Sequence, residues 1–447
     1  MNTNHESVFS PLVGEGFTSL HISHNHKGGT FAFRASRDFE DDCDFSRYNK
    51  GFGINTILTQ KNKCFGTDDV LALYERYGLT GYLNKVLDLM RQGRHIGLNL
   101  TVNNKLGIRH ICGVHSDVRG RNNKSFTTFA GATRRHPLSV PEINVIIDAL
   151  NLSRAMTFKN IAVDLPYGGC KTTLHMDEFA VTDMQKMGFL AYCCDKSHCI
   201  TGPDMSMPKE MVKIMHQNFT MQYCGGPGSP LGDTAVPTAL GTYLALKEVV
   251  LFQRGSASLD GLSIAVQGLG AVGYAMAELL LSEKVKLVVT DIKQENIDRL
   301  KEAYFGRDIK SVPPSEIIYA DVDILCPCAM GGIIGDEEIP RIKAEYVFGA
   351  ANNQIRATNQ TEEIRLAKKL ADAGIFFQTE WWHNGAGVLG AAMEYKHGRD
   401  ITVTNDDLKR AVEMIMPAQT AKNLADAKEK GITPTEAAYA RCEALVY

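Results

Sequence analysis

The residues with the clearest chemical meaning form a glycine-rich turn after the apolar run 264–267. The turn comprises Gly268, Gly270, Ala271, Val272 and Gly273. Its three glycines have the G-x-G-x-x-G spacing. In this pattern the first allows a tight turn, the second lets a pyrophosphate approach the backbone, and the third lets a helix pack closely on a strand. Unpaired N–H groups at the start of that helix favour an anion, so the stretch predicts a dinucleotide site.

An acidic residue stands where such a site needs one. Asp291 follows the apolar run 287–289 and lies 18 positions after Gly273, close to the roughly 20 expected of a carboxylate that binds the ribose 2′-hydroxyl. We therefore expect NAD as the cofactor. A glycine turn without a ligand would not require Asp291.

A second group of candidate residues precedes residue 228. Lys159 follows a long apolar pattern, Lys171 follows a Gly-Gly pair, and Asp204 ends the segment ITGPD. Neighbouring lysines lower each other's pKa, and burial lowers it further. A lysine tuned in this way can polarise water or a carbonyl while an aspartate transfers a proton. From spacing alone, surface lysines and a turn aspartate remain the alternative.

The elements that would position these residues are helices and strands. We expect a helix at about 67–78 that Thr67, Asp68 and Asp69 cap, a second helix at 81–91, and strands at 95–102 and 108–114. Ser139–Glu142 reads as a capping box that opens a long helix through Ile146 and Leu150.

After the glycine- and proline-rich linker 225–230, helix and strand patterns alternate to about residue 395, which favours a doubly wound sheet. From about residue 406 the chain reads as helical, with a break at 431–434.

The first 66 residues are polar and glycine-rich, with few clear elements. Val8–Val13 and Gly29–Arg34 read as short strands that extend a sheet or cover a subunit edge; a loosely packed extension is the alternative. The histidines at 21, 24 and 26 fit a solvated surface better than a metal site, since no cysteine or carboxylate completes a ligand set nearby.

Composition excludes several classes of protein. The chain has 447 residues, 44% of them apolar, and a net charge of −3, so it can bury large cores and offers no basic footprint for nucleic acid. We expect no membrane span, because no run approaches the ~18 apolar residues needed. The segment 1–6 has no signal-peptide pattern. Eleven cysteines without zinc-like or disulfide-like spacing favour reduced thiols, no metal and a cytoplasmic location.

From about residue 127 onward, the chain resembles the glutamate, leucine, phenylalanine and valine dehydrogenases. The branch it resembles most acts on leucine, phenylalanine and tryptophan. The matching segments, in the family's order, are GATR (131–134), MTFKN (156–160), GGCKT (168–172), ITGPD (200–204), AVQGLGAVG (265–273), VVTD (288–291), CPCAMGG (326–332), GAANNQ (349–354) and NGAGV (384–388).

The resemblance implies an α/β fold of two domains. Residues 1–228, including an N-terminal extension of about 90 residues, would form the substrate-binding and oligomerisation domain, completed by C-terminal helices at about 415–447. Residues 229–414 would form a Rossmann-type, doubly wound NAD domain. A homo-oligomer is expected, since members of this family assemble through the first domain.

The resemblance also implies roles for individual residues. Lys159 would bind the substrate α-carboxylate, Lys171 would activate water, and Asp204 would transfer protons at the amino group. Thr238 would lie at the nicotinamide amide and Asn353 between nicotinamide and substrate. Ala329 and Asn352 would also contact the cofactor, and the side-chain pocket would comprise Ala130, Gly131, Met156, Gly202, Val388 and Ala391.

These residues predict reversible, NAD-dependent oxidative deamination of an apolar L-amino acid to a 2-oxo acid and ammonia. Cys170, Arg135 and the run 380–383 depart from the family's pattern, and Arg135 and that run put the substrate in doubt more than the chemistry. Two alternatives remain: a catalytically silent sensor of an amino acid or NAD, and a glutamate dehydrogenase. Glutamate enzymes have a lysine where this chain has Ala130, which argues against the second.

Overall fold

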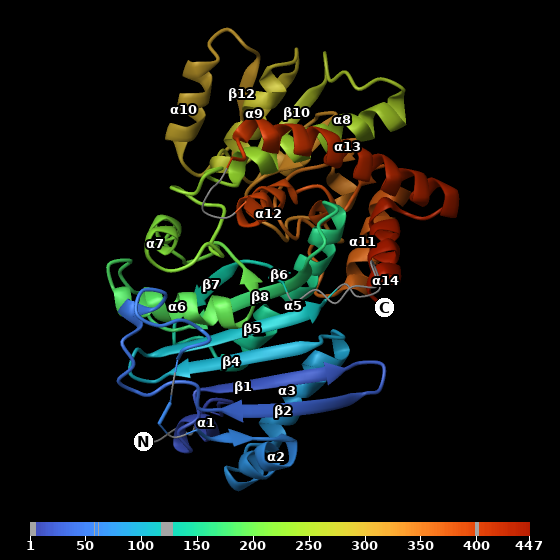
Figure 1. The fold of residues 1–447 in the computed structure, drawn as a ribbon. Helices are drawn as coiled ribbons and strands as arrows, with labels where there is room; N and C mark the ends of the chain where they lie inside the picture. Colours follow the sequence, from blue (N-terminus) through green and yellow to red (C-terminus); the bar gives the residue numbers. More distant parts are fainter. Residues whose placement is uncertain (1–5, 58, 61, 118–127, 398–401) are drawn as a thin grey trace.

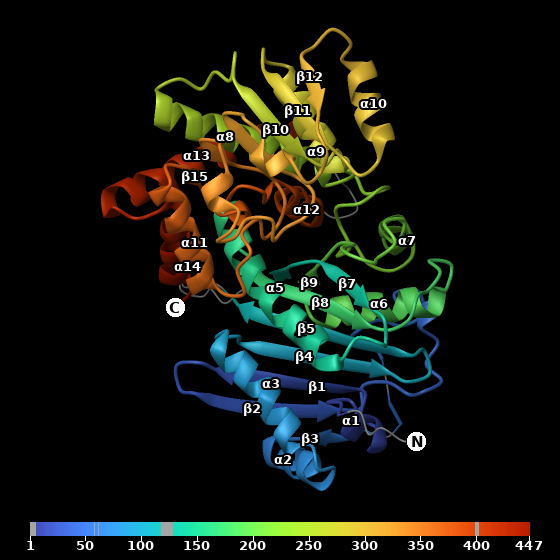
Figure 2. The same cartoon turned by 180° about the vertical axis from the view of Figure 1, so that it is seen from behind.

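The computed structural model describes residues 6–57, 59–60, 62–117, 128–397 and 402–447. Two sheets, one from each half of the chain, lie at opposite ends of the molecule (Figures 1 and 2). Helices from the second half and the long helix α5 (Glu142–Ala162) lie between them. The segment 1–6, which has no signal-peptide pattern, lies outside the described residues except for Glu6.

The first sheet has the order β3-β2-β1-β4-β5-β8-β6-β9, with β7 paired to β8. Neighbouring strands pair antiparallel from β2 through β1, β4 and β5 to β8. The short strands β6, β7 and β9 are added by parallel pairing. The strands are β1 (Ser19–Asn25), β2 (Thr30–Ser36), β3 (Cys64–Phe65), β4 (Gly97–Asn103), β5 (Ile108–Ser116), β6 (Phe129–Ala130), β7 (Thr133–His136), β8 (Gly168–His175) and β9 (Cys199–Ile200).

Helices cover both faces of this sheet. On one face α2, α3 and α5 bury an apolar cluster that includes Leu20, Ile22 and Ile111; α6 and α7 form a second cluster with Leu174. The helices of this half are α1 (Ser10–Gly14), α2 (Thr67–Arg76), α3 (Thr80–Gln92), α6 (Met184–Lys196) and α7 (Met211–Asn218), with the short η1 (Phe45–Arg47).

The N-terminal segment is more ordered than its composition suggested. The strand predicted at Gly29–Arg34 is confirmed as β2, and the segment does extend the sheet because β1 pairs with β4. The strand predicted at Val8–Val13 is wrong, since a short helix with Pro11 in its first turn forms there. The alternative of a loose extension is also wrong.

Two predicted helix starts need correction. Thr67 does not cap α2; it is the first helical residue, after the N-cap Gly66. At α5 no side chain caps the helix, so the predicted capping box is absent. Glu142 is buried instead and accepts hydrogen bonds from Ser7 Oγ at 2.5 Å and Val8 N at 2.8 Å, tying the N-terminal segment to the sheet.

The second sheet is entirely parallel, in the order β12-β11-β10-β13-β14-β15. This is the doubly wound order, whose direction reverses between β10 and β13, where such folds bind ligands. The strands are β10 (Ser263–Gln267), β11 (Lys286–Thr290), β12 (Ile309–Ser311), β13 (Ile324–Pro327), β14 (Tyr346–Val347) and β15 (Phe376–Phe377). The helices are α8 (Ala235–Arg254), α9 (Ala271–Leu281), α10 (Gln294–Ala303) and α11 (Gln360–Asp372), with the short η2 (Ile317–Tyr319), η3 (Ile339–Arg341) and η4 (Glu380–Trp382).

The C-terminal helices connect the two halves. They are α12 (Ala386–His397), α13 (Asn405–Lys430) and α14 (Pro434–Val446), and the predicted break falls at Gly431, whose φ is 64°. Helix α13 packs along α8, while α14 contacts α5 and α11. The C-terminal helices therefore contact both halves of the molecule. The domain boundaries predicted at residue 228 and at about residue 415 stay a prediction.

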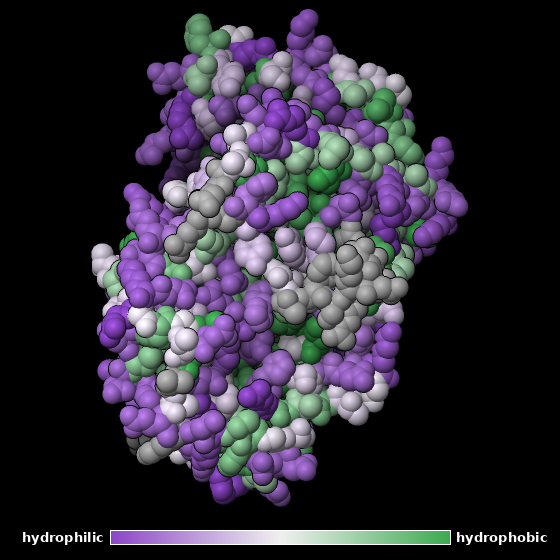
Figure 3. Space-filling view, viewed as in Figure 1, coloured by the Kyte–Doolittle hydropathy of each residue, from purple (hydrophilic) through white to green (hydrophobic). Residues whose placement is uncertain are grey.

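One helix of the described chain, α8, is long and apolar enough to cross a membrane by length and composition, with a mean hydropathy of 1.3, although no such run was expected. Its Ala239, Leu246 and Val250 are buried in the core beneath the second sheet, so we assign it to that core. On the face drawn in Figure 3 the surface is mostly hydrophilic, with apolar residues in separate groups.

Candidate active site

A cavity of about 400 Å³ opens between the two halves of the molecule. It is lined from the first half by Ala130, Gly131, Ala132, Lys159, Ile200, Thr201, Gly202, Pro203, Asp204, Cys224 and Gly225, and from the second by Thr234, Thr238, Val272, Ala350, Asn352, Asn384, Gly387, Val388, Ala391 and Ala392. Most predicted substrate residues thus meet in one place, beside the first turn of α9.

The two predicted catalytic residues contact each other. Lys171 is buried on β8, and its Nζ forms a short ion pair with Asp204 Oδ2. Burial lowers the pKa of Lys171, partly offset by Asp204. Asp204 follows β9 and is brought to β7 by the hydrogen bond from its own N–H to Thr133 O at 2.9 Å. The ammonium and the carboxylate are therefore placed to exchange a proton.

Arg134 is a site residue whose role the sequence did not reveal. Its Nη2 donates to Asp204 Oδ2 at 2.9 Å, and its Nη1 donates to both oxygens of Asp148, at 3.2 and 3.1 Å. Burial raises the pKa of Asp204, but Lys171 and Arg134 outweigh it and hold the pKa well below its ordinary value. The Asp204 carboxylate is thus ionised and held between two cations.

Lys159 reaches the cavity from the last turns of α5. Its Nζ lies 3.4 Å from Asn352 Oδ1, which also accepts a hydrogen bond from Asn384 Nδ2 at 2.9 Å. Burial lowers the pKa of Lys159 to about 8, against the opposing charge of Glu380. This lysine is the cation available to an incoming carboxylate, since Lys171 is occupied by Asp204.

Glu380 is a second residue whose role the sequence did not reveal. It is buried, and burial raises its pKa to about 7. Its Oε1 accepts a hydrogen bond from the N–H of Asn353 at 2.6 Å. Asn353 has a φ of 53°, an uncommon conformation that this contact helps to hold. The sequence feature that could have pointed to Glu380 is an acidic residue directly before the aromatic run 381–383, four positions before Asn384.

Much of the remaining wall of the cavity is small and apolar, although threonines and two asparagines also line it. Ala130, Gly131, Gly202, Val388 and Ala391 line it as predicted. A Cβ at Gly131 would lie 1.9 Å from Cys170 O, so only glycine fits that position. Among the described residues, Lys159 and Asp204 are the charged ones that line the cavity.

Three residues that were considered for the pocket do not line the cavity. Met156 and Asn353 were expected to contact the substrate, yet neither lines the cavity. Arg135 turns away from it and donates to Glu178 Oε1 at 3.0 Å, so no second cation faces a substrate side chain from this position.

The run 381–383 also packs away from the cavity. Trp381 lies against Phe158 and Tyr439, and Trp382 donates from Nε1 to Gln419 O at 3.2 Å. His383 stacks on Phe348 at 3.8 Å. These aromatic side chains support the core and do not narrow the pocket.

The glycine turn has the geometry that a dinucleotide requires. Gly268 has a φ of 88°, and a Cβ there would lie 2.5 Å from the Cβ of Ala329. A Cβ at Gly273 would lie 1.9 Å from Gly268 O, whereas at Gly270 it would meet no described atom within 4 Å. Helix α9 begins at Ala271, so its free N–H groups adjoin this open space. The residues fit the pyrophosphate of NAD.

Asp291 is fixed at the end of β11. Its Oδ2 accepts from Leu269 N at 2.6 Å and its Oδ1 from Lys293 N at 2.7 Å. Burial raises the pKa of Asp291, but these N–H groups outweigh it and hold the pKa below its ordinary value. An ionised carboxylate thus stands beside the turn, where a ribose hydroxyl would bind.

The cysteines differ in part from the expectation of reduced thiols. Cys170, beside Lys171, is joined to Cys199 in a disulfide; the other nine cysteines are free. The sulfur of Cys112 lies within 4.8 Å of both. Two of these three sulfurs are bonded to each other and are not thiolate ligands, so the expectation of no metal stays a prediction.

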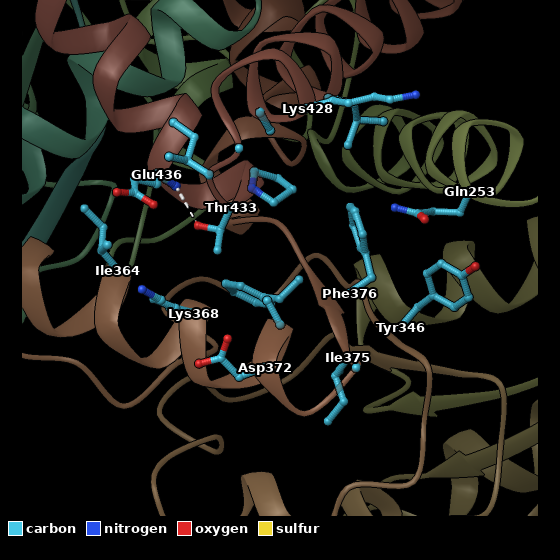
Figure 4. Close-up of a pocket in the computed structure, with 18 of the residues that line it drawn as sticks. Gln253, Tyr346, Ile364, Lys368, Asp372, Ile375, Phe376, Lys428, Thr433 and Glu436 are labelled. Carbon is cyan, nitrogen blue, oxygen red and sulfur yellow. Dashed lines mark hydrogen bonds between the residues drawn. The ribbon is translucent and has the colours of Figure 1, made fainter.

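A larger cavity, of about 840 Å³, lies elsewhere. Phe376 on the edge strand β15, Tyr346, Lys428 and Thr433 line it (Figure 4). None of the predicted site residues lines this cavity.

The fold and the site together define a nicotinamide-dependent amino-acid dehydrogenase. The sequence model for the Glu/Leu/Phe/Val dehydrogenase dimerisation domain matches residues 99–223, and the model for Glutamate/Leucine/Phenylalanine/Valine dehydrogenase matches residues 228–445. The chain belongs to this family and uses NAD.

Individual relatives place it near one branch. It is 32% identical over 315 residues to leucine dehydrogenase of Thermoactinomyces intermedius, covering 69% of this chain and 81% of that protein. It is 32% identical over 297 residues to phenylalanine dehydrogenase of Lysinibacillus sphaericus, covering 64% and 73%. The crystal structure of L-tryptophan dehydrogenase from Nostoc punctiforme superposes with a TM-score of 0.65 at 28% identity, covering 80% of this chain and 98% of that one.

Proposed function

We propose that this protein catalyses the reversible, NAD-dependent oxidative deamination of a branched-chain or aromatic L-amino acid to its 2-oxo acid and ammonia. The observation that carries the proposal is the cavity itself. Lys159 and Asp204, which pairs with Lys171, line it together with Val272 of α9, and small apolar residues make up much of the rest of its wall. The relatives named for leucine, phenylalanine and tryptophan support the same class of substrate.

The chemistry follows from the arrangement of the chain's own residues. Lys159 binds the α-carboxylate and orients Cα. Bound NAD supplies the acceptor for the hydride that leaves Cα. In its neutral form, which burial favours by lowering its pKa, Lys171 takes a proton from the water that attacks the resulting imine carbon, and the ammonium so formed stabilises the charge on the new oxygen. Asp204 transfers the proton that lets ammonia leave, so that the 2-oxo acid remains.

The pocket favours an apolar side chain on energetic grounds. Burial of an aliphatic or aromatic side chain contributes ~1.5–3 kcal/mol. An unpaired buried carboxylate would cost several kcal/mol, and Arg135 is engaged by Glu178 and does not face the cavity. We therefore expect leucine-like or aromatic amino acids to be better substrates than glutamate or aspartate.

The test is NADH formation at 340 nm with the twenty amino acids, with NAD and with NADP. We expect the highest kcat/KM for leucine, phenylalanine or tryptophan, and NAD preferred by at least ~10-fold because Asp291 repels a 2′-phosphate. A higher kcat/KM for glutamate would overturn the apolar-pocket assignment. No turnover with any amino acid, together with intact NADH binding, would favour the catalytically silent sensor.

Two further properties belong to this proposal. A homo-oligomer is supported by the match to a dimerisation domain, and light scattering would test it. A cytoplasmic location is supported by the nine free cysteines, although the Cys170–Cys199 pair is an exception. Cell fractionation would test the location.

A further inference from the structure

A small pocket of about 410 Å³ lies at the β1–β2 turn, beside the end of α14. Its wall combines cationic side chains, two histidines and a tyrosine ring: Lys27, Arg91, Arg94, His24, His26 and Tyr447. None of these residues lines the candidate active site. All of them lie outside the two segments that the family models match.

The pocket is electropositive. Among the described residues, none of the side chains that line it is acidic. Arg91 pairs with Asp88, and both side chains are more than half exposed, so water screens this ion pair. Burial lowers the pKa of His26, and the positive charges of His24, Arg94 and Lys27 lower it further. A bound anion would relieve this repulsion.

His24 carries an unused hydrogen-bonding atom at this pocket. The residue is 5% exposed, its ring stacks on Phe31 at 4.2 Å, and its Nδ1 donates to His95 O at 2.9 Å. Its Nε2 is buried without a hydrogen-bond partner among the described residues. Buried polar atoms in native proteins are nearly always paired. The ring nitrogen Nε2 of His24 is therefore a polar atom that a bound ligand could satisfy.

The opposite wall is held in a fixed arrangement. Arg94 has a φ of 54°, which is uncommon for a residue with a side chain, and its guanidinium lies 4.5 Å from the centre of the Tyr447 ring. The Tyr447 hydroxyl is 2.7 Å from His115 Nε2. Strained backbone that the surrounding structure maintains is found disproportionately at binding sites.

We propose that this pocket binds a phosphate-class oxyanion, either free or as the terminal group of a monoester. Arg94 and Lys27 supply charge-assisted hydrogen bonds, and His24 Nε2 is the buried polar atom in this wall for which the described residues offer no partner. Because the first 98 residues build most of the site, it is a property of the N-terminal extension and independent of the deamination chemistry.

The test is calorimetric titration of the full-length protein with inorganic phosphate. Saturating NADH is present so that the glycine turn is already filled. We expect saturable binding at one site per chain, weakened at least about tenfold by Arg94→Gln and by Lys27→Gln, since each removes a charged donor. Lys85→Gln, on the exposed face of the same helix as Arg91, is the matched control and should bind normally.

Thermal melting would show that the variants are folded. Absence of phosphate binding, or binding that survives both pocket substitutions, would overturn the proposal. A parallel titration with glycerol 3-phosphate identifies the source of the anion: tighter binding than inorganic phosphate supports a monoester, and weaker binding supports the free ion. Neither readout depends on turnover, so failure here leaves the proposed function unaffected.

Discussion

At the scale of single residues, the site is defined by how its charges are paired. Asp204 is held between Lys171 and Arg134, whereas Lys159 makes no ion pair among the described residues and donates to the amide oxygen of Asn352. The two lysines are therefore not equivalent. One is committed to a proton-transfer pair, and the other is free to bind a substrate carboxylate.

This difference predicts two kinds of variant. Lys171→Ala and Asp204→Asn should each lower kcat by ~10²–10⁴, the usual size of a lost acid–base or electrostatic contribution, while NADH binding stays intact. Steady-state kinetics and NADH fluorescence titration measure the two effects. Lys105→Gln, exposed in the turn between β4 and β5, should behave like the unaltered enzyme. Near-normal turnover in either site variant would remove that residue from the mechanism.

A pH dependence follows from Lys159. Burial lowers its pKa to about 8, and only the charged form attracts a carboxylate, so kcat/KM for the amino acid should fall as the pH rises through 8. The profile of kcat/KM reports groups of the free enzyme and substrate. Lys159→Arg, whose charge persists at high pH, should lose the break near pH 8 while keeping any break due to the substrate's own amine. An identical break in both proteins would contradict the assignment.

At the scale of elements, two glycines of the turn between β10 and α9 have different roles, one in cofactor binding and the other in the stability of the fold. Gly270→Ala places a methyl group in open space, while Gly273→Ala drives one into Gly268 O. We expect Gly270→Ala to keep its melting temperature but raise KM for NAD at least tenfold, because the methyl group occupies the pyrophosphate position. Gly273→Ala should lower the melting temperature.

Thermal melting and cofactor kinetics on this pair distinguish the two roles. If Gly270→Ala binds NAD normally, the pyrophosphate does not approach the turn as inferred.

At the scale of the whole molecule, the N-terminal segment is part of the first domain and not an appendage. Strand β1 pairs with β4, and Leu20 and Ile22 are buried in the same cluster as α3 and α5. A chain that starts near Gly66 would expose the edge of β4 and this apolar face. We expect it to be destabilised or to aggregate, with light scattering and melting as the measurements. A stable truncated protein with an unchanged oligomer would show that the segment serves neither stability nor assembly.

The sequence determined the features that depend on local pattern. The glycine turn, the helix after it and Asp291 lie within one strand–helix–strand unit, where spacing alone fixes the geometry. Lys159, Lys171 and Asp204 were identified because each lies in a short segment that resembles the family. The long helix from Glu142 and the break at Gly431 followed from periodicity and from a glycine that can adopt positive φ.

Only the tertiary structure decided which distant residues meet. Arg134 acts on Asp204 because β7 and the segment after β9 lie side by side, and Glu380 acts on Asn353 across 27 residues of chain. The direction of Arg135 and the pairing of Cys170 with Cys199 depend on neighbours that no local pattern specifies. Strand β1 was missed although Leu20 and Ile22 alternate with polar residues such as His21 and Ser23, as a half-buried strand requires. Its pairing with β4 spans most of a hundred residues, so no nearby segment marks its partner. Local propensity fixes which segments can form, whereas long-range packing fixes which side chains share a site.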